Sequence, residues 1–219
     1  MTVPHYNVVI ATPGHSMHKE YVKSLLISTT YLNSLGVSYH FVNQFSSFVP
    51  SARENTATDS YGADWEAVAF GAGKFTYDRI VWIDSDVSWT VEALQTLLDT
   101  DLDIVSGMVA VDRTGRFGAM KLNEAGNPVS LNSRNFIVEG EPFEVDGVGF
   151  GFLAVKAGVF EKMERPWFRV RQISIETAPF KVDLGEDYSW CVGAKEAGFS
   201  IWLHPLVRVE HMKEMVLTV

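Results

Sequence analysis

The chain has 219 residues, 47% of them hydrophobic and 21% charged, a balance typical of a globular protein with a substantial core. Its formal net charge of −9, with 18 scattered basic residues, excludes a general nucleic-acid binder, because a phosphate backbone must be met by clustered Lys and Arg. The single cysteine, Cys191, cannot form an internal disulfide, and no apolar run reaches membrane-spanning length. Since the first residues also lack a signal-peptide pattern, we expect a cytoplasmic protein with no membrane span and no nucleic-acid partner.

The first 85 residues alternate between strand and helix patterns. Apolar, β-branched runs at 6–11, 37–43 and 79–83 predict strands, and apolar residues at helical spacing predict helices at 19–35 and 51–72. Such an alternation implies a parallel sheet with crossover helices. In open sheets of this kind, ligands bind beyond the carboxyl ends of the strands.

Asp84 and Asp86 follow the apolar run 80–83 directly, at such a carboxyl end. Two like charges this close are costly to bury unless something compensates them, and a cation or a reaction that uses a carboxylate would do so. A structural interpretation also exists, because Asp and Ser often end strands, and Thr90 is a suitable N-cap for a helix over 90–98. The position at the sheet edge favours a functional site.

The second half of the chain has a different pattern. After a strand at 104–109, turn signals crowd the segment 112–144 and predict a mixed β region. The remaining predicted elements are a glycine-punctuated strand at 145–155, a short helix at 157–163, an irregular aromatic segment at 165–181, a helix at 187–197, and short strands at 128–131, 201–203 and 207–210. With no repeat or linker, we expect one domain over 1–219.

Two further features carry side chains suited to chemistry. Glu186 and Asp187 open the helix after Gly185, where the macrodipole favours carboxylates as caps, but where a general base is also often presented. His211 closes the last strand, next to Glu210. A lone histidine is usually a surface residue, yet an imidazole beside two aspartates would complete an octahedral O/N site of the Mn²⁺ or Mg²⁺ type.

Taken in order, these segments resemble the GT-A glycosyltransferases, which use nucleotide-sugar donors. The resemblance runs from about residue 6 to 211 and has five parts: Ala11-Thr-Pro-Gly14, Ser51-Ala-Arg-Glu-Asn55, the Asp-X-Asp motif in Trp82-Ile-Asp84-Ser85-Asp86, Val145-Asp-Gly-Val-Gly149-Phe-Gly151-Phe, and Gly185-Glu186-Asp187 with the terminal His211. Glu54 departs from the family's Ala-Arg-Asn segment. The resemblance implies an α/β fold: a single GT-A, Rossmann-like domain with a mixed, mostly parallel central sheet flanked by helices and a small β/loop acceptor region.

The resemblance also implies roles for individual residues. A divalent cation, Mn²⁺ or Mg²⁺, would be held by Asp86 and His211, with Asp84 on the ribose, on a metal-bound water or on the metal itself. The other implied roles are donor nucleotide binding by Thr12, Pro13, Arg53, Ser85 and the two aspartates, catalysis by Asp187 and Glu186, and acceptor binding by Gly149, Gly151 and Trp167.

The function implied is a metal-dependent hexosyl transfer from a nucleotide-diphosphate sugar to a hydroxyl acceptor such as a glycan, with inversion. UDP-sugars are favoured and GDP-sugars stay open; residues 1–110 would bind the nucleotide sugar, and 111–219 would bind the acceptor and supply catalysis. One alternative is a haloacid-dehalogenase-like phosphatase with Asp84 as nucleophile and Asp86 as acid, although that motif normally ends the first strand of its domain. The other alternative is a non-catalytic nucleotide- or glycan-binding domain.

Overall fold

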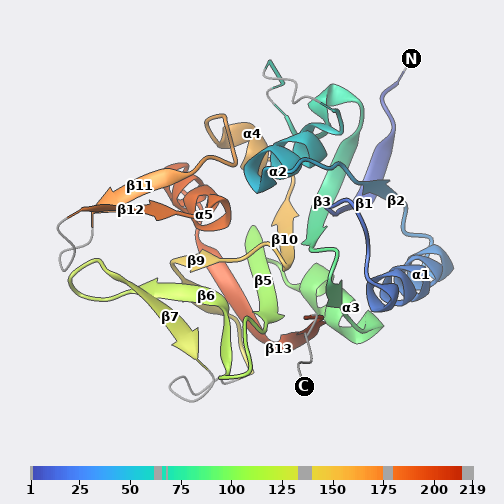
Figure 1. The fold of residues 1–219 in the computed structure, drawn as a ribbon. Coiled ribbons are helices and arrows are strands. Elements are labelled where there is room, and N and C mark those ends of the chain that lie inside the picture. The colour runs from blue at the N-terminus through green and yellow to red at the C-terminus, as the bar shows by residue number, and fades with distance from the viewer. Residues whose placement is uncertain (1, 62–65, 68, 133–139, 175–179, 214–219) are drawn as a thin grey trace, which may run out of the picture.

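A computed structural model of the chain describes residues 2–61, 66–67, 69–132, 140–174 and 180–213. At its centre is an eight-stranded sheet (Figure 1). The order across the sheet is β2 (Tyr39–Val42), β1 (His5–Ala11), β3 (Thr76–Ile83), β10 (Phe152–Lys156), β5 (Ile104–Val109), β13 (Ile201–His211) and β4 (Val87–Ser88), and β8 (Phe143–Val145) pairs with β13.

The sheet is mixed but mainly parallel, as predicted. Strand β1 pairs in parallel with β2 and β3, and β13 pairs in parallel with β5. Strand β10 lies antiparallel to both of its neighbours, β3 and β5, so the five strands β1, β2, β3, β5 and β13 all point the same way. Their carboxyl ends therefore meet at one edge of the sheet, where the functional residues were expected.

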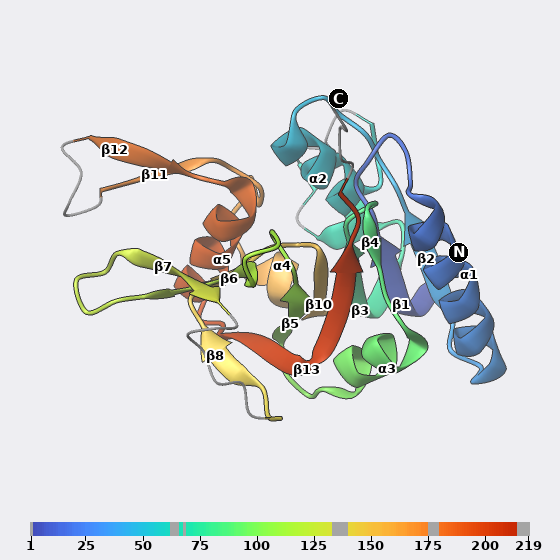
Figure 2. The ribbon, with the colours of Figure 1, turned by 60° about the horizontal axis from the view of Figure 1, so that its bottom comes forward.

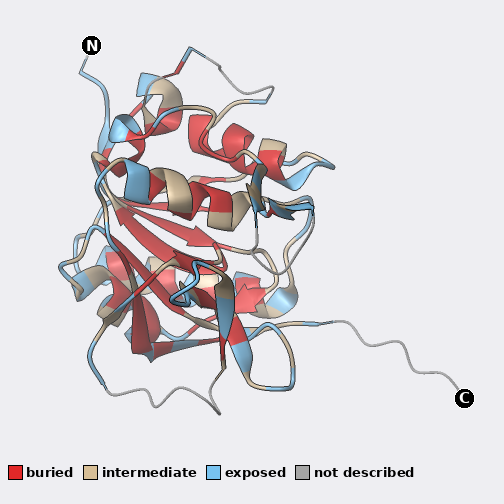
Figure 3. Cartoon of the chain, turned by 90° about the vertical axis from the view of Figure 1, so that its left-hand side faces the viewer, coloured by how far each residue is buried: buried red, intermediate tan, exposed pale blue. Residues whose placement is uncertain are grey.

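Helices cover both faces of the sheet because its strands are apolar on both sides. Helices α1 (Lys19–Ser34) and α3 (Val91–Asp99) pack on one face, against alternate strand residues such as Val8 and Ile10. Helices α2 (Val49–Thr58), α4 (Val159–Lys162) and α5 (Glu186–Glu196) pack on the other, with the short 3₁₀ helix η1 (Phe70–Gly73), against residues such as Val9 and Ala11. Buried residues dominate the central strands (Figure 3).

The second face holds a cluster of aromatic rings around Trp82, whose side chain is fully buried. The rings of Phe70, Phe150 and Phe168 meet it edge to face at centroid distances of 6.0, 5.3 and 5.3 Å. Truncation of a ring packed in this way to alanine costs about 3–5 kcal/mol. This cluster ties α2, η1 and the β10 segment to the third strand, and so supports the loop that carries Asp84 and Asp86.

Two predicted elements need correction. The helix expected over 51–72 ends at Thr58, because Asp59 adopts a left-handed conformation with φ 47°; residues 62–65 and 68 lie outside the described part of the chain. The strand expected over 145–155 is broken into the end of β8, β9 (Gly147–Val148) and β10, with a turn at residues 149–151. The second break places glycine backbone next to the carboxyl edge of the sheet, where Gly151 accepts the Asp84 N–H.

Two hairpins extend from one side of the molecule. Strands β6 (Arg116–Leu122) and β7 (Pro128–Asn132) form a three-stranded sheet with β9, which confirms the strand predicted at 128–131. Strands β11 (Arg171–Ser174) and β12 (Lys181–Leu184) form a second hairpin inside the segment predicted to be irregular. Figure 2 shows the hairpins projecting together, with α5 behind them. Among the helices of the described residues, none has the length and apolar character needed to cross a bilayer.

Candidate functional site

The carboxyl edge of the sheet brings together residues that are far apart in the sequence. Asp84 and Asp86 lie just beyond β3, and His211 is the last residue of β13. The Asp84 N–H donates to the carbonyl of Gly151 at 3.2 Å, and the Met212 N–H donates to the carbonyl of Asp86 at 2.8 Å. These backbone bonds hold the Asp-Ser-Asp loop against both the start of β10 and the end of β13.

Arg53 connects this loop to the amino end of α5. Its side chain comes from α2, is buried, and donates from Nη2 to Asp84 Oδ1 at 3.3 Å and from Nε to Glu186 Oε1 at 3.2 Å. The guanidinium carbon lies 4.9 Å from the centre of the Phe150 ring, which favours the cation further. The Nη1 group is buried without a hydrogen-bond partner among the described residues, so one donor group of this guanidinium is left unsatisfied there.

Asp187 lies beside this ion-pair network but takes part in no ion pair among the described residues. Burial raises its pKa to about 6, against the opposing charge of Arg53, and the neighbouring carboxylates of Glu186 and Asp84 raise it further. Its Oδ1 accepts the N–H of Tyr188 at 2.8 Å. A carboxylate that titrates near neutrality and is not neutralised by a partner is suited to act as a general base.

Gly149 lies directly against this carboxylate. A Cβ placed on Gly149 would be 3.5 Å from Asp187 Oδ2, and the residue is only partly buried. The missing side chain therefore leaves room for another molecule to approach Asp187, and that Gly149 borders an acceptor stays a prediction.

Asp86 faces His211 and not Asp84. The distance from His211 Nε2 to Asp86 Oδ2 is 3.0 Å, and His211 Nδ1 lies 2.8 Å from the carbonyl oxygen of Ala110, to which it donates. The hydrogen bond to Asp86 raises the pKa of His211 despite partial burial. Burial alone would raise the pKa of Asp86. The hydrogen bond with His211 and the ammonium of Lys213, 3.5 Å away, outweigh burial and hold the pKa of that carboxyl below its usual value.

This pair fits a divalent cation as two of its ligands. Adjacent ligands of an octahedral ion at about 2.1 Å stand roughly 3.0 Å apart, which matches the Asp86–His211 separation. The bond from Nδ1 to a backbone carbonyl is the arrangement that orients metal-bound histidines. No cluster of three or more His, Cys, Asp or Glu occurs among the described residues, and Asp84 is turned towards Arg53, so further ligands would be oxygens of a bound molecule and water.

The loop after β1 contributes to the same edge, but not through Thr12. The Thr12 side chain is completely buried and hydrogen-bonds the Tyr21 hydroxyl, so only backbone of Thr12 and the ring of the half-exposed Pro13 can border a ligand. Gly14 reaches Ser85: a Cβ there would lie 3.0 Å from Ser85 Oγ.

A pocket of about 740 Å³ opens beside this loop. Ser85 and Asp86 line it together with residues that the sequence did not single out: Ser16, Met17, His18, Lys19, Met212 and Lys213. Isolated basic residues carry no local signal in a sequence, and only the fold brings Lys213 next to His18 and Lys19.

Two predicted acceptor residues are placed elsewhere. The Trp167 side chain is 2% exposed and its indole N–H donates to the Phe160 carbonyl at 3.0 Å, so it belongs to the core. Gly151 is buried in β-strand packing, where a Cβ would lie 3.1 Å from the Val109 methyl groups. Neither residue is exposed to a substrate, and both are removed from the candidate acceptor contacts.

Glu54, which departs from the Ala-Arg-Asn segment, has a structural role. Its buried carboxylate accepts from Arg165 Nη2 at 3.0 Å and from the Phe168 N–H at 2.8 Å. The pair fixes the segment before β11 against α2. Arg53 keeps its position at the site, because its neighbour Glu54 faces away from it towards Arg165.

Comparison with known proteins gives matches at the level of the fold. No protein-family model matches the sequence, and no curated protein matches it. Among solved structures, the A197 protein from STIV has a TM-score of 0.54 at 15% identity, with 97% of each chain covered, which shows a shared fold.

Two further structures are similar at lower scores. A mutant of Drosophila beta-1,4-galactosyltransferase 7 in complex with manganese, UDP-Gal and xylobiose has a TM-score of 0.49 at 14% identity, over 95% of this chain and 71% of that one. The inositol-1-phosphate CTP transferase from T. maritima has a TM-score of 0.45 at 12% identity, over 94% and 89%.

Proposed function

We propose that this protein is a metal-dependent glycosyltransferase of the GT-A type, which moves a sugar from a nucleotide-diphosphate sugar to a hydroxyl acceptor. The observation that carries the proposal is the bridge made by Arg53. It holds the Asp-Ser-Asp loop, with the Asp86–His211 pair beside it, against the amino end of α5, which presents Asp187. A cation-binding pair and a base that titrates near neutrality thus share one edge of the sheet.

The donor would lie across residues 1–110, with UDP-sugars favoured as the donor class. Its diphosphate enters the pocket lined by His18, Lys19 and Lys213, whose basic side chains complement phosphate oxygens. Asp86 and His211 would hold the cation, Mn²⁺ or Mg²⁺, which would supply Lewis-acid stabilisation of the negative charge on the leaving diphosphate. The free Nη1 of Arg53 donates to the donor sugar or phosphate.

The acceptor, a glycan or another hydroxyl compound, would approach from residues 111–219 past Gly149. Asp187 removes the proton of the acceptor hydroxyl as its oxygen forms a bond to the anomeric carbon. The bond from that carbon to the β-phosphate oxygen breaks, and its electron pair leaves with the nucleoside diphosphate. Attack from the face opposite the leaving group inverts the anomeric centre. Glu186 acts as a positioning residue, because its carboxylate is engaged by Arg53.

The phosphatase alternative is less well supported. It requires Asp84 as a free nucleophile, whereas Asp84 is paired with Arg53. The strand that precedes Asp84 is also the third along the chain, and not the first as the phosphatase motif would require. A covalent role would require that ion pair to break before each turnover.

Calorimetric titration of UDP and GDP, each with and without Mn²⁺, tests the proposal on the wild type and on Asp86→Ala. We expect one nucleotide to bind only with Mn²⁺, and the variant to lose that metal-dependent affinity. The matched control is Asp183→Ala on β12, an exposed aspartate away from the pocket, which is expected to bind as the wild type does. Absence of binding by both nucleotides, with and without the metal, would contradict the proposal.

A further inference from the structure

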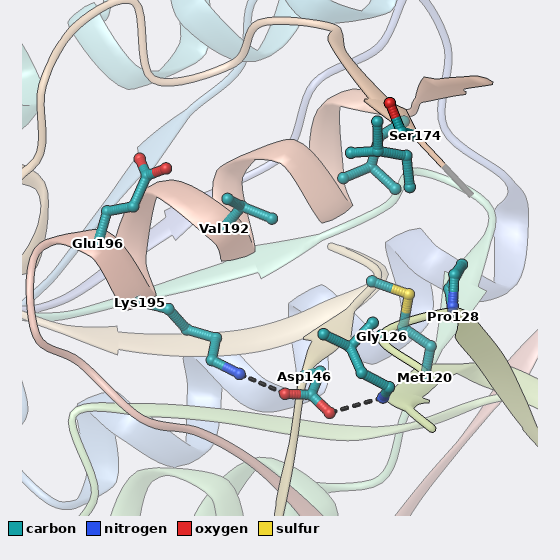
Figure 4. A pocket seen from close by; sticks show the side chains of 11 residues that line it. Met120, Gly126, Pro128, Asp146, Ser174, Val192, Lys195 and Glu196 are labelled. Atoms are coloured by element: carbon teal, nitrogen blue, oxygen red, sulfur yellow. Dashed lines mark hydrogen bonds and ion pairs between the residues drawn. The ribbon is translucent and has the colours of Figure 1, made fainter. Parts of the chain in front are cut away.

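A second pocket, of about 640 Å³, lies between the β6–β7 hairpin, the β11–β12 hairpin and α5 (Figure 4). It is separate from the pocket beside Asp86 and shares none of its lining residues. Its apolar wall is built from Met120, Leu122, Pro128, Ile173, Leu184 and Val192. Each of the three elements contributes to this wall, so the space is a product of the tertiary fold.

The chemistry of the wall indicates an aliphatic occupant. Among the described residues that line it, every apolar side chain is aliphatic or a thioether. The charged side chains there are already engaged: Asp146 accepts from Lys195 and from the Leu122 N–H, and Glu196 is held by Arg171 at 2.6 and 2.7 Å. An alkyl chain would gain from burial against the six apolar side chains of this wall.

The pocket lies near the candidate base. Its lining residue Leu184 precedes Asp187 by three residues, and its lining residue Val192 lies about 7.5 Å beyond Asp187 along the axis of α5 at 1.5 Å per residue. Tyr188, the neighbour of Asp187, lies close to the wall: a Cβ on Gly147 would lie 2.7 Å from Tyr188 Cδ1 and 2.9 Å from Cε of the lining residue Met120.

The rim of the pocket is apolar on the β6–β7 hairpin. Leu122, which lines the pocket, is 46% exposed. An exposed apolar side chain at the edge of a pocket extends its apolar surface outwards, as a chain longer than the pocket would require.

We propose that this pocket binds an aliphatic chain, and that the chain is the non-sugar part of the acceptor. The second half of this statement rests on the proposed glycosyl transfer; the first half does not. An acceptor held in this way places its hydroxyl at Asp187, with its alkyl body against α5. The enzyme would then select alkyl-bearing acceptors over free sugars.

The test is calorimetric titration with methyl, hexyl and octyl β-D-glucoside, each below the concentration at which it forms micelles. Each buried methylene contributes ~0.8 kcal/mol, or about fourfold in affinity, so octyl glucoside is expected to bind about 15-fold more tightly than hexyl glucoside. Methyl glucoside should not bind measurably. Affinity that does not depend on chain length overturns the proposal.

Two variants locate the binding. Val192→Trp fills the pocket, and Leu122→Asp places a charge on its partly exposed rim with little effect on folding; each is expected to weaken octyl glucoside binding at least tenfold. Leu26→Asp on α1, 62% exposed and remote from the pocket, is the matched control and should bind as the wild type does. Unchanged affinity in both pocket variants overturns the proposal.

The same samples are titrated with UDP and Mn²⁺, so that the two hypotheses fail separately. Loss of chain-length dependence with intact nucleotide binding overturns the pocket assignment alone. Chain-length-dependent binding without nucleotide binding supports the pocket and overturns the assignment of the chain as an acceptor.

Discussion

Asp187→Asn should make the protein more stable at neutral pH while abolishing transfer. The pKa of this carboxyl rises from its ordinary value of 3.8 to about 6 in the folded protein, chiefly through burial. The ionised form is therefore disfavoured by ~3 kcal/mol in the native state relative to the unfolded chain. Asparagine has no charge to bury, and its side-chain oxygen can still accept the Tyr188 N–H that now reaches Oδ1.

The direction in which the free energy of unfolding changes with pH follows from proton linkage. Because the folded pKa is the higher one, the native state binds the proton more tightly, so stability falls as pH rises from about 4 to about 6 and stays lower above that. Between about pH 5 and pH 8 the ionisation of Asp187 should lower the free energy of unfolding of the wild type by ~1.4 kcal/mol. The variant should show no such decrease from this position.

Urea unfolding of both proteins at these two pH values measures the difference directly. Transfer by the wild type should fall as pH drops through about 6, because the base becomes protonated. Parallel pH dependence of stability in wild type and variant would refute the argument that Asp187 is a buried, destabilising charge.

Four other outcomes are expected. Arg53→Ala should lower the free energy of unfolding by about 3 kcal/mol in urea, because the carboxylates of Asp84 and Glu186 lose their buried partner. Gly149→Ala should change stability by less than about 1 kcal/mol, since its Cβ makes only ordinary contacts, but lower kcat/KM at least tenfold by narrowing the approach to the base. His211→Ala should weaken Mn²⁺ binding about 10-fold or more in a calorimetric titration, since it removes a ligand. Addition of a chelator should abolish transfer without lowering Tm, because each aspartate of the loop has a counter-charge from the chain itself.

The first half of the fold could be predicted because its local signals agree with one another. Apolar strands, amphipathic helices and the cap at Thr90 all indicate crossover units, and the structure has them. The second half could not be predicted as well, since hairpin pairing and strand breaks depend on tertiary contacts. The β11–β12 hairpin is an example: Arg171 is held by Glu196 of α5, which no local pattern reveals.

The candidate site, too, could be predicted from the sequence only in part. Asp84, Asp86, Asp187 and His211 could be proposed from chain position and residue type, because carboxyl ends of strands and amino ends of helices are visible in a sequence. The partners of these residues could not. That Trp167 is buried and that Thr12 is turned towards Tyr21 depend on which face of each segment packs inwards.

Two aspartates can lie at the end of the same strand because the chain turns between them. The Val87 N–H donates to the Asp84 carbonyl at 3.0 Å, and this turn directs the side chains to different neighbours. Asp84 reaches Arg53 on α2, and Asp86 reaches His211 on β13. Each carboxylate therefore has a partner from a different element, and these contacts within the chain hold the edge of the sheet in place. A divalent ion at Asp86 would join an arrangement that is already ordered, so its binding can support chemistry without being needed for folding.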